Sequence, residues 1–211
     1  MARKIKVYIV GRATSYARFL RDVELVDDIK DANIVLFTGG EDVDPSLYGK
    51  TKHPTTYSNI YRDNEEAKIF NRIRQDQLAL GICRGSQFLC VANGGILIQD
   101  CDNHAIYGTH EIEEIKTGRT YQITSTHHQM QYPYELDEKD YTLLFKATPE
   151  RSSHYFGDGI NERVVRNNGE AEIVLYHREG HPKCLAVQGH PEMIPDSPIA
   201  DRINEIIYEL L

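Results

Sequence analysis

The sequence predicts an α/β fold in which helices cover both faces of a mixed, centrally parallel sheet, forming a three-layer sandwich. Three short, continuous apolar runs bounded by glycines or turns are typical of buried parallel strands; they lie at residues 5–10, 33–37 and 78–82. Later segments alternate apolar and polar residues, as half-exposed antiparallel strands do. These two patterns together indicate a parallel centre with antiparallel strands beside it.

The first half of the chain places short helical patterns between its strands. Residues 16–22 are expected to form a short helix, and residues 41–61 a loop containing several aspartates and prolines. Asp63, followed three residues later by Glu66, resembles a capping box and predicts a helix that begins near Asp63. A capping role for Arg62 and Asp63 and a functional role remain alternatives at this point.

The second half contains the predicted antiparallel strands and the last helix. Residues 86–92 are expected to be helical and residues 96–98 a short strand. Ser197 is expected to cap the last helix, with Pro198 at its first position. The alternating segments are residues 111–116, 120–124, 142–147 and 171–177, the segment 152–168 reads as a surface loop, and 184–188 reads as another buried strand.

Composition limits the classes of protein to which the chain belongs. Its 211 residues carry a net charge of −8, and we expect one domain over residues 1–211. This charge, without a large basic cluster, argues against a nucleic-acid partner. No apolar run approaches the ~20 residues of a membrane span, and no signal peptide is visible, so we expect a cytoplasmic protein without a membrane partner. Its four cysteines are expected to be thiols.

Cys83 is the strongest candidate for a catalytic residue. It lies between a predicted strand and a predicted helix and is flanked by Gly81 and Gly85. A nucleophile on such a tight turn needs small neighbours, because the backbone there is strained and crowded. The N-terminus of the following helix favours a thiolate over a thiol. The alternative is a small buried cysteine in the core of an α/β protein.

A cysteine nucleophile needs a base, and the base needs an orienting group. Of the nine histidines, His190 is the best candidate because it follows a buried strand and so lies at the same sheet edge as Cys83. Glu192 follows two residues later, and Pro191 stiffens the turn between them. The three side chains form a plausible triad in the order Cys, His, Glu.

These motifs resemble the class I glutamine amidotransferase-like superfamily. Residues 81–87 resemble its Gly-x-Cys-x-Gly-x-Gln elbow, and residues 189–192 resemble its His-Pro-Glu box. Further segments resemble the γ-glutamyl-γ-aminobutyrate hydrolase branch, and small proteins of this type also occur in bacteriophages. These segments are residues 38–45, Arg62-Asp63 with Glu66, and residues 125–129.

The resemblance implies a role for each of these residues. Cys83 would attack the γ-carbonyl of glutamine or of a γ-glutamyl amine and form a γ-glutamyl thioester. His190 would transfer the proton and Glu192 would orient His190. The backbone amides of Gly40 and Arg84 would form the oxyanion hole. The glutamyl end of the substrate would be held by Gln87, Ser125, His127 and Gln129.

The other histidines are expected to have lesser roles, and no cofactor is expected. His104 and His110, with Asp102 nearby, do not have the spacing of a usual zinc site, so no metal is expected. His127 and His128 point to opposite sides if the chain is extended there, so at most one of them reaches Cys83. We expect His127 to be the one that reaches Cys83, and His128 to be structural or solvated.

Three functions remain open. The first is a free-standing hydrolase of a small γ-glutamyl substrate, and the second is a glutaminase subunit that supplies ammonia to a separate synthetase or amidoligase. The third, which the intact triad disfavours, is an inactive binding module. The chain departs from the γ-glutamyl hydrolases at Cys90 and Met193 and over residues 11–31 and 152–168. These departures leave the released amine undetermined.

Overall fold

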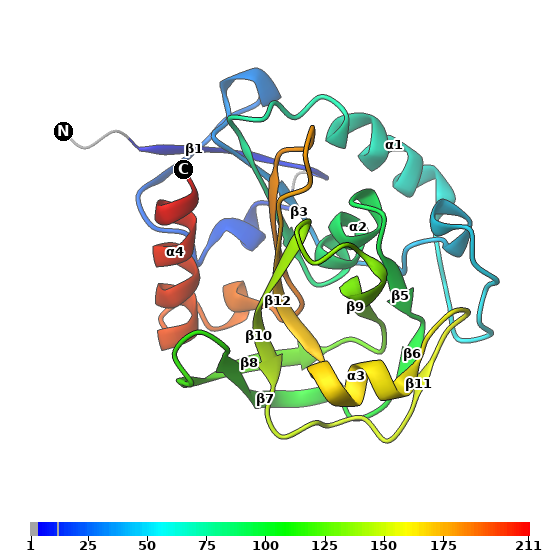
Figure 1. The fold of residues 1–211 in the computed structure, drawn as a ribbon. Coiled ribbons are helices and arrows are strands. Elements are labelled where there is room, and N and C mark those ends of the chain that lie inside the picture. Colours follow the sequence, from blue (N-terminus) through cyan, green and yellow to red (C-terminus); the bar gives the residue numbers. More distant parts are fainter. Residues whose placement is uncertain (1–3, 12) are drawn as a thin grey trace.

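The computed structural model describes residues 4–11 and 13–211, and within these residues nine strands form one sheet (Figure 1). The strand order is β2-β1-β3-β4-β13-β12-β10-β7-β8. The five strands from β2 to β13 run parallel, and β12, β10, β7 and β8 continue the sheet antiparallel. The mixed, centrally parallel sheet that the sequence predicts is therefore confirmed.

Four of the five parallel strands lie where the sequence has continuous apolar runs, whereas the edge strand at Val23–Leu25 has no such run and is not predicted. Its strands are β1 (Ile5–Ile9), β2 (Val23–Leu25), β3 (Ile34–Phe37), β4 (Leu78–Ile82) and β13 (Lys183–Val187). Every residue of β3 and β4 is buried, as expected for strands covered on both faces. In the register of β4 with its neighbours, Leu80 lies between Leu36 and Leu185.

The antiparallel half is more exposed. In β7, Glu111 is exposed and Glu113 is partly buried, whereas Ile112 between them is fully buried. This alternation is typical of a sheet with one solvent-exposed face. The strands are β7 (Ala105–Glu114), β8 (Thr120–Thr126), β10 (Tyr141–Ala147) and β12 (Ala171–Tyr176).

Helices cover the two faces of the sheet (Figure 1). On one face α1 (Ile60–Phe70) and α2 (Arg84–Ala92) pack Phe70 and Phe88 against Phe37 of β3. On the other face α4 (Pro198–Leu210) buries Ile199, Ile203 and neighbouring apolar residues in the cluster that contains Val7 and Leu80. Ser197 caps α4 by accepting a bond from the Ala200 amide, as predicted. None of the described helices is both long and apolar enough to cross a membrane.

Two small sheets and several short helices complete the described chain. β5 (Ile96–Ile98) pairs with β9 (Met130–Tyr132), and β6 (Asp100–Cys101) pairs with β11 (Tyr155–Phe156). The 3-10 helices are η1 (Thr14–Ala17), η2 (Ile29–Asp31), η3 (Pro45–Tyr48), η4 (Pro133–Glu135) and η5 (Pro191–Met193).

Three predictions about local structure are wrong. The segment 152–168 is not a loop throughout, because it contains β11 and α3 (Glu162–Asn168), and Val165 of α3 is fully buried. The helix expected over 16–22 is the single 3-10 turn η1. Helix α1, predicted to begin near Asp63, begins at Ile60 with Asn59 as its cap. Asp63 and Glu66 do not cap the helix, since they face inward and bind Arg84.

Candidate active site

Cys83 occupies a strained turn between β4 and α2. Its φ of 53° and ψ of −112° are rare for a residue with a side chain. The glycines that flank it are required by close approach, as predicted: a Cβ on Gly81 would lie 2.5 Å from the carbonyl oxygen of Gly85, and a Cβ on Gly85 would overlap the carbonyl of Phe37. The turn thus brings the helix N-terminus directly against the sheet and leaves the thiol at its tip.

Hydrogen bonds hold the backbone of this elbow from both sides. The amide of Cys83 donates to the carbonyl of Val187 on β13 at 2.8 Å. The carbonyl of Cys83 accepts from the amide and the hydroxyl of Ser86 at 2.9 and 2.7 Å, and from the amide of Gln87 at 3.3 Å. The strained conformation is therefore stabilised by four contacts that do not involve the thiol.

His190 and Glu192 lie beside the elbow because β13 runs parallel to β4. Val187 pairs with Ile82, so the chain that follows β13 emerges next to Cys83. The Nδ1 atom of His190 lies 2.7 Å from Oε1 of Glu192. The backbone of His190 is anchored by Thr124 of β8, whose hydroxyl accepts from its amide at 2.7 Å and donates to its carbonyl at 3.2 Å.

The electrostatics of this group favour a protonated imidazole. Burial alone would lower the pKa of His190, but hydrogen bonds to Cys83 and Glu192, together with the charges of both groups, raise that pKa to about 10. His190 therefore holds its proton at neutral pH as long as both partners are present. The structure brings the three side chains of the predicted triad together.

Tyr16 is a neighbour of the site that the sequence analysis did not single out. It lies in η1, in the segment that departs from the family pattern, and its ring centroid is 6.0 Å from that of His190. Burial raises the pKa of Tyr16, and the charges of Glu192 and Cys83 raise it further. No local signal marks this tyrosine, because it reaches the site only through the folding of the N-terminal segment over the sheet edge.

Gly39 and Gly40, which follow β3 and are called the glycine segment below, lie beside Tyr16 and His190. A Cβ on Gly39 would lie 2.6 Å from the hydroxyl of Tyr16 and 3.2 Å from Cε1 of His190. Gly40 has a φ of 142°, and a Cβ at this position would overlap the guanidinium of Arg62. Among the described residues, the amides of Gly40 and Arg84 have no hydrogen-bond acceptor. Within the described part of the chain, neither amide is occupied.

The predicted substrate-binding residues are buried and connected to one another. Gln87 donates through Nε2 to the carbonyl of Gln129 at 2.8 Å, and this carbonyl also lies 3.0 Å from Nδ1 of His127. Ser125 lies 3.4 Å from the other nitrogen of His127. The Oε1 atoms of Gln87 and Gln129 are buried and have no partner among the described residues. Buried acceptors of this kind are usually hydrogen-bonded, so these two oxygens are exceptions within the described chain.

Of the two adjacent histidines, His127 is buried and His128 is partly exposed, but no described contact joins His127 to Cys83, contrary to the prediction that it reaches the thiol. His127 is 4% exposed, and its described contacts are with Gln129, Ser125 and His104 and not with the thiol. Burial, and next the charges of neighbouring histidines, keep the pKa of His127 well below its usual range. His128 is partly exposed and lies 3.3 Å from Asp42 and 3.4 Å from Asp100, and these contacts raise its pKa.

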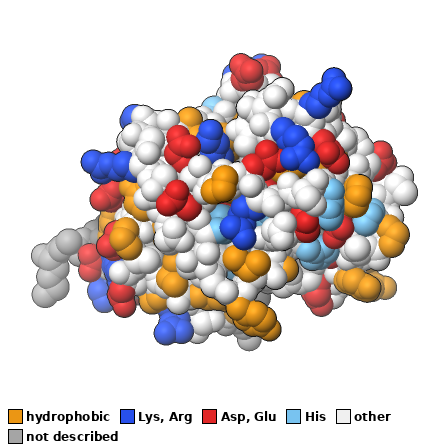
Figure 2. Space-filling view, turned by 90° about the horizontal axis from the view of Figure 1, so that it is seen from below, with side chains coloured by type: hydrophobic (Ala, Val, Ile, Leu, Met, Phe, Trp, Pro, Cys, Tyr) orange, Lys and Arg blue, Asp and Glu red, His pale blue; other side chains and the backbone are white. Residues whose placement is uncertain are grey.

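The contacts of His128 belong to a partly exposed group of histidines and carboxylates. His154 lies 3.4 Å from Asp100, and its ring stacks on Phe156 at 4.5 Å between centroids. Figure 2 shows histidine side chains gathered beside acidic and hydrophobic ones on one side of the face in view. Since Asp42 follows the glycine segment closely, its pair with His128 joins two segments of the candidate site.

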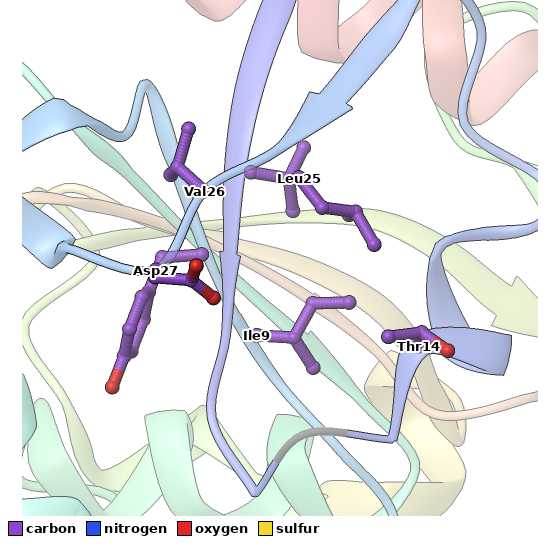
Figure 3. Close-up of a pocket in the computed structure, with 7 residues that line it drawn as sticks. Ile9, Thr14, Leu25, Val26 and Asp27 are labelled. Atoms are coloured by element: carbon purple, nitrogen blue, oxygen red, sulfur yellow. The ribbon is translucent and has the colours of Figure 1, made fainter.

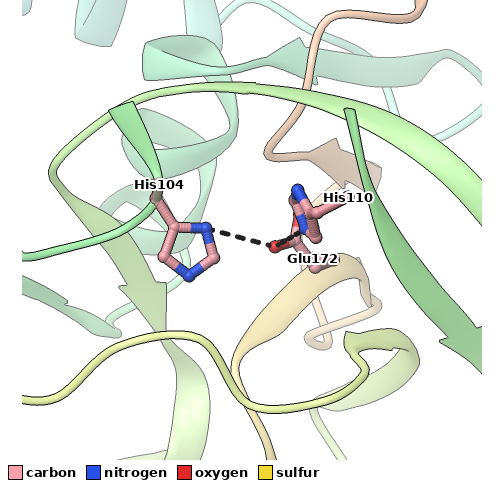
Figure 4. Close-up of side chains that lie close together, drawn as sticks. All are labelled: His104, His110 and Glu172. Carbon is pink, nitrogen blue, oxygen red and sulfur yellow. Dashed lines mark hydrogen bonds and ion pairs between the residues drawn. The ribbon is translucent and has the colours of Figure 1, made fainter. Parts of the chain in front are cut away.

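His104, His110 and Glu172 form a buried cluster of groups that are able to ligate a metal ion (Figure 4). Their donor atoms lie within 4.8 Å of one another, the only such group found among the described residues. However, His110 Nε2 is 2.9 Å from Glu172, and the two nitrogens of His104 lie 3.1 Å from Ser125 and 3.2 Å from Glu170. His104 and His110 thus contact Ser125 and Glu172, whereas Nε2 of His104, Nδ1 of His110 and Oε2 of Glu172 are buried without a hydrogen-bond partner among the described residues.

One pocket of the molecule lies away from these residues. It has a volume of about 420 Å3 and is lined by β1, β2 and Thr14 (Figure 3). It contains Ile9, Leu25, Val26 and Asp27 but no member of the predicted triad. Asp27 is the one carboxylate among the described residues that line it.

Comparison with known proteins identifies the family. The family model of peptidase C26 matches residues 19–192, and the chain belongs to this family. The family and the relatives support the class I glutamine amidotransferase-like superfamily that the motifs resemble.

Three relatives illustrate the similarity. Protein NtpR of Enterococcus hirae is 25% identical over 183 residues, covering 80% of this chain and 70% of NtpR. The glutamine amidotransferase-like protein YvdE of Lactococcus lactis is 28% identical, covering 75% of this chain and 65% of YvdE. The amidotransferase-like protein Rv2859c of Mycobacterium tuberculosis is 41% identical over 193 residues. The match covers 81% of this chain but only 54% of Rv2859c, so the chain spans little more than half of that relative.

Solved structures show the same fold. A GMP synthase subunit protein from Thermoplasma acidophilum superposes with a TM-score of 0.62 at 16% identity, covering 100% of this chain and 95% of that chain. A glutamine amidotransferase from Thermotoga maritima gives a TM-score of 0.57 at 13% identity, covering 99% and 95% of the two chains. At these identities the similarity establishes the fold and nothing finer.

Proposed function

We propose that the protein hydrolyses a γ-glutamyl amide bond, in glutamine or in a γ-glutamyl amine, through a thioester on Cys83. The observation that carries this proposal is the strained elbow of Cys83 beside the paired His190 and Glu192. Membership of the peptidase C26 family supports amidohydrolase chemistry of this general kind. A small γ-glutamyl substrate is the ligand expected.

Each group would act at a defined step. The sulfur of Cys83 attacks the γ-carbonyl carbon, and the negative charge moves to the carbonyl oxygen. The amides of Gly40 and Arg84 would stabilise this oxygen, a contribution of about 3–4 kcal/mol for each donor. His190 gives its proton to the leaving amine and then takes one from water, while Glu192 orients the ring. Water attack on the thioester releases glutamate and regenerates the thiolate.

The glutamyl end would be held by Gln87 of α2 together with the residues at the carboxyl end of β8. The unpartnered oxygens of Gln87 and Gln129 would accept hydrogen bonds from the α-ammonium group. Ser125 and His127 would complete this wall, with the network around His104 holding them in position. The departing amine would lie outside this group, so these residues select the acyl part of the substrate.

Substitution of the thiol tests the proposal. Cys83→Ala is expected to abolish release of amine from glutamine and from γ-glutamyl compounds with neutral, acidic and basic leaving amines, because no thioester forms. The matched control is Cys184→Ala, which removes a buried thiol at the far end of β13. It is expected to keep hydrolysis within a few-fold of wild type. Hydrolysis at the wild-type rate by Cys83→Ala would contradict the proposal.

A second candidate is a glutaminase subunit that passes ammonia to a separate synthetase or amidoligase. It is favoured by a structural neighbour whose assigned identity is a synthase subunit. Robust hydrolysis of γ-glutamyl amines by the isolated chain would reject this candidate, whereas glutaminase activity that appears only with a synthetase would favour it. An inactive binding module would instead leave Cys83 unmodified by a glutamine-like chloroketone, as read by mass spectrometry.

A further inference from the structure

Arg62 hydrogen-bonds to backbone carbonyls in and directly before the glycine segment, which contains Gly40 of the candidate oxyanion hole. Its Nη2 atom donates to the carbonyl of Gly39 at 2.9 Å and to the carbonyl of Thr38 at 3.1 Å. Its Nη1 atom lies where a Cβ on Gly40 would be, so a side chain at Gly40 would displace the guanidinium. On the other side, Gly39 faces Tyr16 and His190. The segment is therefore held between Arg62 and the catalytic histidine.

The bond to Gly39 determines the direction of the Gly40 amide. The carbonyl of Gly39 and the N–H of Gly40 belong to the same peptide unit, which is planar and trans. Because the two groups of a trans peptide point in opposite directions, a carbonyl held by Arg62 directs the N–H toward the side of His190. A positive charge on the carbonyl also polarises the unit and makes its N–H a stronger donor.

The other amide of the candidate oxyanion hole is held in a comparable way. The N–H of Arg84 shares its peptide unit with the carbonyl of Cys83, which accepts bonds from Ser86 and Gln87. In each case the carbonyl is bound on one side of the peptide and the N–H is left free on the other.

Two buried carboxylates on α1 connect these two peptide units. Glu66 accepts from Nε of Arg62 at 2.9 Å and also pairs with the guanidinium of Arg84. Asp63 pairs with the same Arg84 and accepts from the amide of Asp44, beyond the glycine segment, at 2.9 Å. The side chain of Arg84 is 1% exposed, and those of Asp63 and Glu66 are 0% and 5% exposed. One charged network thus contacts both the elbow and the glycine segment.

We propose that Arg62 is a positioning residue, which orients the Gly40 amide for the oxyanion and couples it through Glu66 to the elbow. The inference rests on the proposed hydrolase function for its kinetic effect, but not for its structural effect. Arg62 acts on the oxygen that becomes charged during acylation. It does not act on the thiol, the base or the glutamyl-binding residues.

Kinetics separate this role from a general loss of structure. Arg62→Met is expected to lower kcat for γ-glutamyl amide hydrolysis on the order of 10- to 100-fold, below the 10²–10³-fold cost of losing a whole oxyanion donor. KM is expected to stay within a few-fold, because the glutamyl-binding residues are elsewhere. Alkylation of Cys83 by iodoacetamide, which develops no oxyanion, should keep its wild-type rate. An equal fall in alkylation would overturn the proposal.

Two further variants test the geometry. Arg62→Lys keeps the charge but lacks the planar set of donors that binds Glu66 and two carbonyls together, so it should lose most of the same activity; wild-type kcat would overturn the proposal. Arg62→Ala should regain activity with added methylguanidinium, because a pocket of about 380 Å3 borders Thr38, Gly39 and Arg62. Absence of any rescue would count against the proposal. Lys68→Met, on the exposed face of α1, is the matched control.

A readout that needs no activity distinguishes the two proposals. In wild type and Arg62→Met, amide hydrogen exchange is measured over residues 38–42. Faster exchange in the variant, with unchanged exchange in β4, is expected. Unchanged exchange over residues 38–42 would overturn the role of Arg62 whether or not the protein hydrolyses γ-glutamyl amides. If wild type hydrolyses none of them but exchange rises as expected, only the hydrolase function fails.

Discussion

At the scale of single residues, the site depends on a backbone conformation that a side chain disfavours. Cys83 has a φ of 53°, and the only other non-glycine residues with positive φ in the described chain are Asp22 and Asn103. Asparagine and aspartate tolerate this region because their short side chains form local hydrogen bonds. Cysteine has no such compensation, so its conformation is retained at a cost in folding stability.

A glycine at position 83 should therefore be more stable than an alanine there. Cys83→Gly is expected to raise the free energy of unfolding above that of Cys83→Ala by about 1 kcal/mol, because glycine adopts positive φ without strain. Both variants lose the thiol, so the comparison isolates the backbone term. Urea unfolding of the two variants measures it. If Cys83→Gly were the less stable of the two, the elbow would not be strained in solution.

The pKa of His190 predicts how stability changes with pH. Because that pKa is raised from 6.5 to about 10, the contacts of the imidazolium stabilise the folded protein fully below about pH 6.5. This contribution is lost as pH rises through 10. Glu192→Gln removes one of these contacts, so it should destabilise the protein most at pH 6 and least at pH 10. Urea unfolding at pH 6, 8 and 10 checks this, and a pH-independent difference would contradict it.

At the scale of elements, α1 shows how a motif can be recognised and yet misassigned. The spacing of Asp63 and Glu66 fits a capping box, but Asn59 caps the helix and both acids pair with Arg84 beneath it. Burial opposes these charges: it raises the pKa of Asp63 and, with the nearby charge of Arg62, lowers the pKa of Arg84 to about 10. The network therefore connects α1 to α2 at an energetic cost.

Breaking this network should be much more damaging than breaking a surface pair on the same helix. Asp63→Ala is expected to lower the free energy of unfolding by about 3–5 kcal/mol, because it leaves a buried guanidinium short of one partner. Glu65→Ala removes an exposed pair with Lys68 and should cost at most about 1 kcal/mol. Chemical denaturation of both variants measures the difference. Equal losses would show that Arg84 finds another partner or water.

At the scale of the whole molecule, the two halves of the sheet follow from patterns in the chain. Continuous apolar runs predict four of the five parallel strands, all but β2, and alternation predicts β7, β8, β10 and β12. The segment 152–168 is predicted wrongly because α3 has only 7 residues. Composition rich in Ser, Gly and Asn outweighs so short a helical pattern, and the burial of Val165 exists only once β5, β9 and β11 are in place.

The features that can be predicted from the chain alone are local: the strands, the elbow of Cys83 with its two glycines, and the position of His190 and Glu192 after a buried strand. They are predictable because strand periodicity, glycine spacing and a short turn are properties of neighbouring residues. The contact of Tyr16 with His190, and the hold of Arg62 on the peptide of Gly40, arise only in the folded molecule. Such contacts join segments whose side chains meet only after the sheet has assembled, and no short-range pattern encodes them.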